Sequence, residues 1–108
     1  MKTDSELATL FAAFAHPTRI AVLRCLLKHC PIGRQFGDLS NDLGISPSTL
    51  KHHLDEMQRA GVLTREAFGR ATILKLDLAV LAQAGAQLSQ ICCSADSEPL
   101  PSEKDTNA

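Results

Sequence analysis

The chain has 108 residues, with eleven Lys and Arg against twelve Asp and Glu, and a formal net charge of −1. This length predicts one small domain, a size that often gains stability by pairing with a second copy. The near-neutral charge excludes nucleic-acid binding through a strong positive field alone, so such binding would need shape and specific contacts. No segment approaches the roughly 18 apolar residues of a membrane helix, and the start lacks the apolar run of a signal peptide.

Four cysteines are present without a CxxC spacing. The missing CxxC spacing argues against a zinc ribbon. Because no membrane helix or signal peptide is apparent, we expect a cytoplasmic protein with reduced thiols, and we expect no permanent cofactor. The sequence also lacks a nucleophile elbow, a phosphate-binding glycine loop and a paired-carboxylate motif, which argues against an enzyme.

Three helices are predicted in the first part of the chain, over residues 5–15, 17–29 and 36–43. In the first, the apolar residues follow the i, i+3, i+4, i+7 spacing of one helix face: Leu7, Leu10, Phe11 and Phe14. Proline disfavours helical geometry in the residue before it, so Pro17 separates the first helix from the second. The inner face predicted for the second helix consists of Ile20, Leu23, Leu26 and Leu27.

The stretch around Ser46 is the most informative in the sequence. Gly44 suits a helix end, Ser46 an N-cap and Pro47 a first helical position, so a further helix is predicted over 47–60. A helix, a tight turn containing glycine and a second helix form the helix-turn-helix pattern. The outer face of the second helix is polar: Ser48, Thr49, Lys51, His52, Asp55 and Arg59.

Residues 62–68 and 71–76 are rich in strand formers, and Gly69 and Arg70 lie between them. They predict a two-stranded hairpin with an arginine at its tip. A last helix is predicted over 78–93. Its apolar residues repeat at intervals of four, three and four, a narrow seam suited to packing on a like helix: Leu81, Gly85, Leu88 and Cys92.

Residues 94–108 are polar and carry four acidic residues against one lysine, a balance of −3. We expect them to form a disordered tail after a folded domain of residues 1–93.

This order of elements resembles the ArsR/SmtB family of winged helix-turn-helix repressors, and three segments carry the resemblance. Residues 14–20, FAHPTRI, resemble the family's opening "ALADPTRL", and residues 46–54, SPSTLKHHL, resemble its recognition helix "SxSTVSHHL". Residues 60–63, AGVL, with the later Gly69-Arg70, resemble its "AGLV…GR" wing. The resemblance implies a mainly α fold with a two-stranded β wing, dimeric through the first and last helices.

The resemblance also implies binding to an inverted repeat in double-stranded operator DNA and release by a metal, a metalloid or a reactive sulfur species. Two recognition helices of a dimer would enter successive major grooves, while the wing tip reaches a minor groove or a phosphate. Without the family pattern, Lys51 and Arg59 would be interpreted equally well as solvent-exposed residues of a helix or as DNA contacts. We expect His53 and Arg19 to be structural. The candidate DNA-binding residues are Ser46, Ser48, Thr49, Lys51, His52, Arg59 and Arg70.

Three inducer sites of the family can be compared with this sequence. The "CxC" of the third helix is absent, because Gln35 and Gly37 replace the cysteines, and the last helix lacks the histidines of the zinc sensors. Cys92 and Cys93 resemble the "LTENCC" ending of an arsenic-responsive branch. Thiolates select thiophilic ions, so the expected inducer is trivalent arsenic, trivalent antimony or an organoarsenical.

Trivalent arsenic favours three sulfur ligands, and the third is open: Cys30, Cys25, a cysteine of the partner chain, a small thiol or hydroxide. An organoarsenical needs only two thiolates. Alternatively, Cys92 is a packed seam residue, and Cys25, amid leucines, favours core packing. A second alternative is a persulfide or redox sensor that uses Cys25 and Cys92, although the corresponding cysteine of that branch aligns with Arg24.

Overall fold

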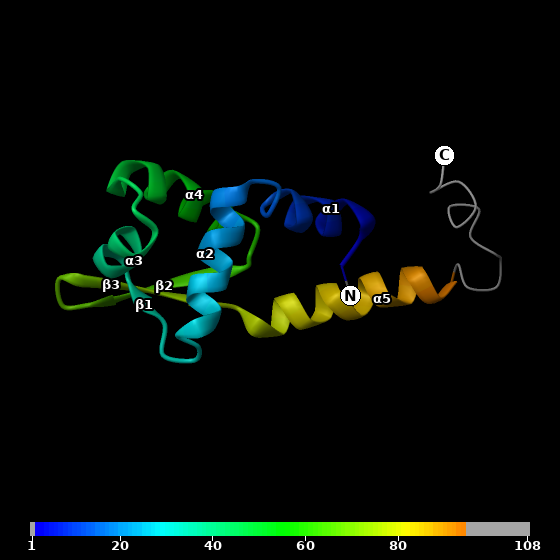
Figure 1. Cartoon of the computed structure of the whole chain (residues 1–108). Helices are drawn as coiled ribbons and strands as arrows, with labels where there is room; N and C mark the ends of the chain where they lie inside the picture. Colours follow the sequence, from blue (N-terminus) through cyan, green and yellow to red (C-terminus); the bar gives the residue numbers. More distant parts are fainter. Residues whose placement is uncertain (1, 95–108) are drawn as a thin grey trace.

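The computed structural model describes residues 2–94, so the expected disordered tail lies outside the described residues, apart from Ser94. The chain runs in the order α1 (Asp4–Ala12), α2 (Pro17–Lys28), β1 (Arg34–Gln35), α3 (Phe36–Leu43), α4 (Pro47–Arg59), β2 (Leu63–Phe68), β3 (Ala71–Leu76) and α5 (Leu78–Ser94). This is a winged helix-turn-helix, as the sequence predicts (Figure 1).

Local capping explains where the helices begin. Thr3 and Glu6 form a capping box at α1, and the ring Nδ1 of His16 accepts from the Thr18 amide at 3.1 Å ahead of α2. Helix α1 ends at Ala12, before the predicted Ala15. His16 is extended because it precedes Pro17, and the chain needs a turn to reach that geometry.

The wing is part of a three-stranded antiparallel sheet of order β1-β3-β2. The hairpin of β2 and β3 pairs Leu63 with Leu76 and Phe68 with Ala71. The predicted two-stranded wing is therefore incomplete, because Arg34 and Gln35 add β1 to the far edge of β3. Two residues carry too little alternation to be recognised as a strand in the sequence.

One apolar core joins all five helices to the sheet. Helix α2 packs against α3, α4 and β3, and it buries Val22, Cys25 and Leu26. Its inner face differs from the predicted one, since Leu27 is 49% exposed. The fully buried large side chains are Leu10, Leu26, Leu39, Leu50, Leu54, Met57, Leu63, Leu74, Val22 and Val62.

The wing and the end of α5 project from opposite ends of the molecule, and α1 lies along α5 (Figure 1). The side chain of Gln87 on α5 donates to the Lys2 carbonyl at 2.6 Å and so ties the start of the chain to this helix. In residues 2–94 no single helix is long and apolar enough to cross a membrane; only α1 and α2 together, bent by 90°, meet that criterion.

Candidate nucleic-acid interface and cysteine sites

The turn between α3 and α4 is held by three local contacts. Gly44 ends α3 with a φ of 64°, a left-handed conformation that glycine adopts without steric cost. The Ser40 hydroxyl, buried, donates to the Ile45 carbonyl at 2.5 Å. The Ser46 hydroxyl accepts from the Thr49 amide at 3.4 Å and donates to the Thr49 hydroxyl at 2.9 Å. The hydroxyl groups of Ser46 and Thr49 therefore fix the start of α4.

Helix α4 has one buried and one exposed face. Leu50, Leu54 and Met57 are fully buried, and His53 is 6% exposed beside them. Ser46, Ser48, Thr49, Lys51, His52 and Arg59 are all exposed. The structure thus brings the candidate DNA-binding residues of this segment together on the exposed side of α4.

The wing tip supplies the remaining candidate. Gly69 has a φ of 62° and makes the tight turn between β2 and β3. Arg70 and Phe68 are exposed there, and Phe68 retains 73% of its accessible surface. A guanidinium on a projecting two-stranded hairpin can reach a phosphate or a minor groove.

Most lysine and arginine side chains of α4 and the wing form ion pairs. Lys51 and Arg65 both contact Asp55, Arg59 contacts Glu56, and Lys75 contacts Glu66. Within residues 46–76, all of which the structure describes, Arg70 is the one lysine or arginine without an ion pair. Three carboxylates thus pair with four of the five cations, and the segment keeps its weakly positive net charge of +2.

Arg65 and its contact with Asp55 were missed by sequence reasoning. The Lys51–Asp55 pair has the i, i+4 spacing of a helix and is readable from the sequence. The Arg65 contact joins α4 to β2 across ten residues, and only the docking of the sheet on the helix creates it.

His53 joins the helix to the start of α2. The Arg19 Nε donates to the His53 Nδ1 at 3.1 Å, and the His16 ring lies 4.6 Å from the His53 ring. Burial, followed by the positive fields of His16, Arg19 and His52, lowers the pKa of His53. The expected structural roles of His53 and Arg19 agree with these contacts.

Cys92 and Cys93 lie near the end of α5, and both are exposed. Two neighbouring exposed thiols are a chemically suitable donor set for a thiophilic ion. Among residues 2–94, however, no group of three His, Cys, Asp or Glu side chains is placed to hold a metal ion. A single chain therefore supplies two of the three sulfur ligands that trivalent arsenic favours.

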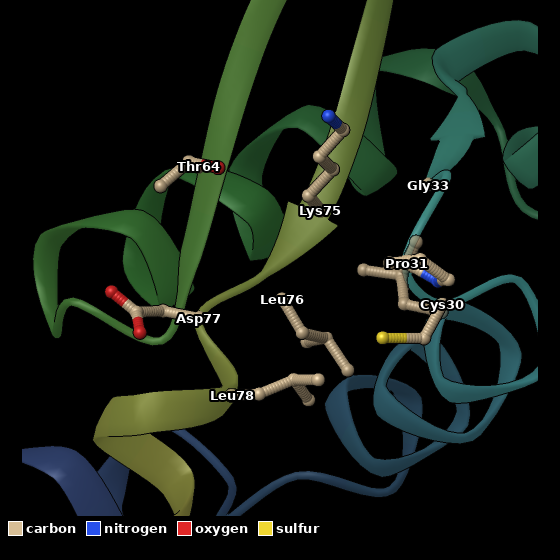
Figure 2. A pocket seen from close by; sticks show the side chains of 9 residues that line it. Cys30, Pro31, Gly33, Thr64, Lys75, Leu76, Asp77 and Leu78 are labelled. Atoms are coloured by element: carbon tan, nitrogen blue, oxygen red, sulfur yellow. The ribbon is translucent and has the colours of Figure 1, made fainter.

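Cys30 cannot complete this site within one chain. Its sulfur faces Leu76 in a hollow between the end of α2 and the start of α5, beside Leu78 (Figure 2). Cys92 lies near the opposite end of α5, about 20 Å further along at 1.5 Å per residue. Within one chain, Cys30 is therefore too far from Cys92 to be the third ligand, whereas the other candidates for that ligand stay open.

Cys25 is also excluded as an intrachain partner. It is buried in α2 at the interface with α3, and its thiol donates to Asp42 Oδ2 at 3.6 Å. Burial and then the Asp42 carboxylate raise the pKa of Cys25, which disfavours the reactive thiolate. Core packing explains Cys25, and the Cys25–Cys92 pair of a persulfide sensor is not assembled in one chain.

The comparisons with known proteins agree with this geometry. A helix-turn-helix domain family matches residues 14–66. An ArsR-like transcriptional regulator from Rhodococcus sp. RHA1 has a TM-score of 0.73 and 26% identity over 86% of this chain and 85% of its own. A possible transcriptional regulator for arsenical resistance has a TM-score of 0.64 and 27% identity over 77% of this chain and 82% of its own.

A homodimeric winged helix-turn-helix domain from Mycobacterium bovis, a possible ArsR-family regulator, has a TM-score of 0.66 at 17% identity, covering 91% of this chain and 93% of its own. No curated protein sequence matches the chain. The chain therefore contains a helix-turn-helix domain, and its whole fold is similar to the winged helix-turn-helix fold of solved transcriptional regulators of the ArsR type.

Proposed function

We propose that this protein is a homodimeric, cytoplasmic transcriptional repressor, rather than an enzyme, that binds double-stranded operator DNA. The observation that carries the proposal is the exposed polar face of α4. Local hydrogen bonds hold the turn at which this helix begins. An α-helix presented in this way fits the major groove of B-DNA.

The dimer follows from the exposed apolar residues of the last helix. Leu78, Leu88 and Ile91 are 44%, 45% and 52% exposed, and the seam residues Gly85 and Cys92 are exposed beside them. A second copy of α5 would cover this seam, and the M. bovis neighbour is itself homodimeric. The two α4 helices of such a dimer would read the two half-sites of an inverted repeat.

The DNA-binding proposal is tested by fluorescence anisotropy of labelled duplex DNA from upstream of the gene. Wild-type protein should bind this duplex more tightly than a random duplex at moderate salt. Lys51→Ala should weaken binding to the upstream duplex while the dimer remains intact by sedimentation. Equal, salt-sensitive binding to both duplexes would contradict a role as a specific repressor.

We further propose that trivalent arsenic, trivalent antimony or an organoarsenical is the inducer, bound at Cys92 and Cys93. The support is the exposure of both thiols at the end of the helix expected to form the dimer. An organoarsenical would need these two thiolates alone. For inorganic arsenic, the third ligand would come from the partner chain, a small thiol or hydroxide.

A ligand at this helix end would bias the dimer geometry and so the spacing of the two α4 helices. By linkage, DNA must weaken inducer binding by the same factor by which the inducer weakens DNA binding. Arsenite should therefore release the duplex from the fully reduced wild-type protein.

The double variant Cys92→Ser, Cys93→Ser should bind DNA like the wild type but should not respond to arsenite. Cys30→Ser is the matched control, because it removes a thiol at the other end of α5 and should respond normally to an organoarsenical, which needs only the two thiolates of Cys92 and Cys93. Release of DNA from the double variant on arsenite addition would show that the site assignment is wrong. Release by polysulfide and not by arsenite would support the sulfur-sensing alternative.

A further inference from the structure

Asp55 is held by two cations at once. Its Oδ2 lies 3.1 Å from the Lys51 Nζ on the same helix, and its Oδ1 lies 2.6 Å from an Arg65 Nη2 on β2. One carboxylate thus joins the exposed face of α4 to the wing.

The carboxylate sits near the middle of that exposed face. At 100° per residue, Asp55 lies close in angle to Ser48, His52 and Arg59, and roughly opposite the buried His53 and Met57. If α4 enters a major groove, as the proposed function requires, Asp55 enters with it.

The two ion pairs differ in strength. Arg65 has a side chain only 25% exposed, and its Nε is buried without a hydrogen-bond partner, so packing holds the guanidinium in place. Lys51 has a side chain 65% exposed, and an exposed pair of this kind contributes little stability. Arg65 therefore anchors the carboxylate, and Lys51 is the exchangeable partner.

The carboxylate is also ionised at neutral pH. The hydrogen bonds from Arg65 and then from Lys51 lower the pKa of Asp55. A fixed negative charge therefore faces any DNA in the groove.

We propose that Asp55 is a specificity-determining residue, which rests on the proposed DNA binding. It competes with DNA phosphates for Lys51, and it repels base edges that present only acceptors. Of the four bases, cytosine and adenine present an amino donor in the major groove, and a carboxylate tolerates such a donor. Sequences without a donor at the contacted position are rejected by a repulsive contact.

The test compares wild-type protein with Asp55→Asn on two duplexes: the tightest site that the wild type selects from a random duplex pool, and a random duplex. Asparagine retains an oxygen that accepts from Arg65 and removes the charge. Asp4→Asn is the matched control, because it makes the same chemical change at an exposed position on α1 with no ion pair among the described residues.

On the random duplex, Asp55→Asn should bind more tightly. The slope of log affinity against log salt should steepen by about 0.9, the value for one phosphate contact, as Lys51 becomes free. On the selected site the gain should be smaller, so the ratio of the two affinities should fall by about tenfold. The double variant Asp55→Asn, Lys51→Gln should lose the extra slope. Repeating the selection with Asp55→Asn should show relaxed base preference at one position in each half-site.

An unchanged slope, affinity ratio and selected site in Asp55→Asn would overturn the inference. So would a loss of affinity on both duplexes by a folded variant, because Asp55 would then serve DNA contact. If Asp55→Asn does not fold, Asp55→Ser replaces it with the same expected slope and ratio. Failure of the wild type to prefer any sequence would instead reject the proposed repressor function.

Discussion

The helix-turn-helix and wing differ from α5 in how much of their apolar and charged surface is buried or paired within one chain. Helix α4 buries Leu50, Leu54 and Met57 fully, and its lysine and arginine form ion pairs within the chain. Along residues 78–93 of α5, Ala84 is the one buried residue, and large apolar side chains remain exposed. One chain therefore buries the apolar face of α4, whereas it leaves large apolar side chains of α5 exposed, as the proposed α5 dimer requires.

The largest expected effect comes from a charge on the α5 seam. Leu88→Glu should raise the dimer dissociation constant by about a hundredfold or more, because association would bury an unpaired carboxylate. Sedimentation equilibrium measures this constant. Ile32→Glu is the matched control, since Ile32 is 79% exposed and lines a hollow beside β2 and β3 that contains no residue of α5. Equal dissociation constants for the two variants would place the dimer interface elsewhere.

A smaller effect is expected from a cavity in the buried core beneath α4. Leu54→Ala removes a fully buried side chain from α4 and should lower the free energy of unfolding by about 2–5 kcal/mol. Urea titrations at two protein concentrations check this, because the loss at Leu54 should not depend on concentration. A decrease in the free energy of unfolding below about 1 kcal/mol would show that α4 is loosely packed, contrary to the full burial of its apolar face.

The smallest expected effect concerns pH. Burial and its positive neighbours lower the pKa of His53 in the folded state, so the unfolded state binds the proton first. The stability contributed by neutral His53 is fully present above the unfolded value, about 6.5, and is lost as pH falls from there toward the lower folded pKa.

Thermal unfolding between pH 7 and pH 5 should show this decline, and His53→Gln should flatten it. The carboxylates with lowered pKa, among them Asp42, Asp55 and Glu56, lose their contribution below about pH 4.5, outside this window. An identical decline in His53→Gln would assign the titration to another group.

The sequence by itself determined the order of helices and strands and most of their ends. Pro17, Gly44, Ser46 and Pro47 act on neighbouring backbone groups, so their effects are readable from local spacing. The polar face of α4 was readable for the same reason, since helical periodicity assigns its side chains to two faces.

The tertiary structure alone decided the contacts between distant segments. The pairing of β1 with β3, the Arg65–Asp55 contact, the burial of Cys25 and the separation of Cys30 from Cys92 each depend on how whole elements dock. Periodicity places a side chain on a face of its own element, but it does not say which distant residue that face will meet. The adjacent cysteines could therefore be recognised from the sequence. Only the tertiary structure showed that no third ligand from the same chain lies beside them among the described residues.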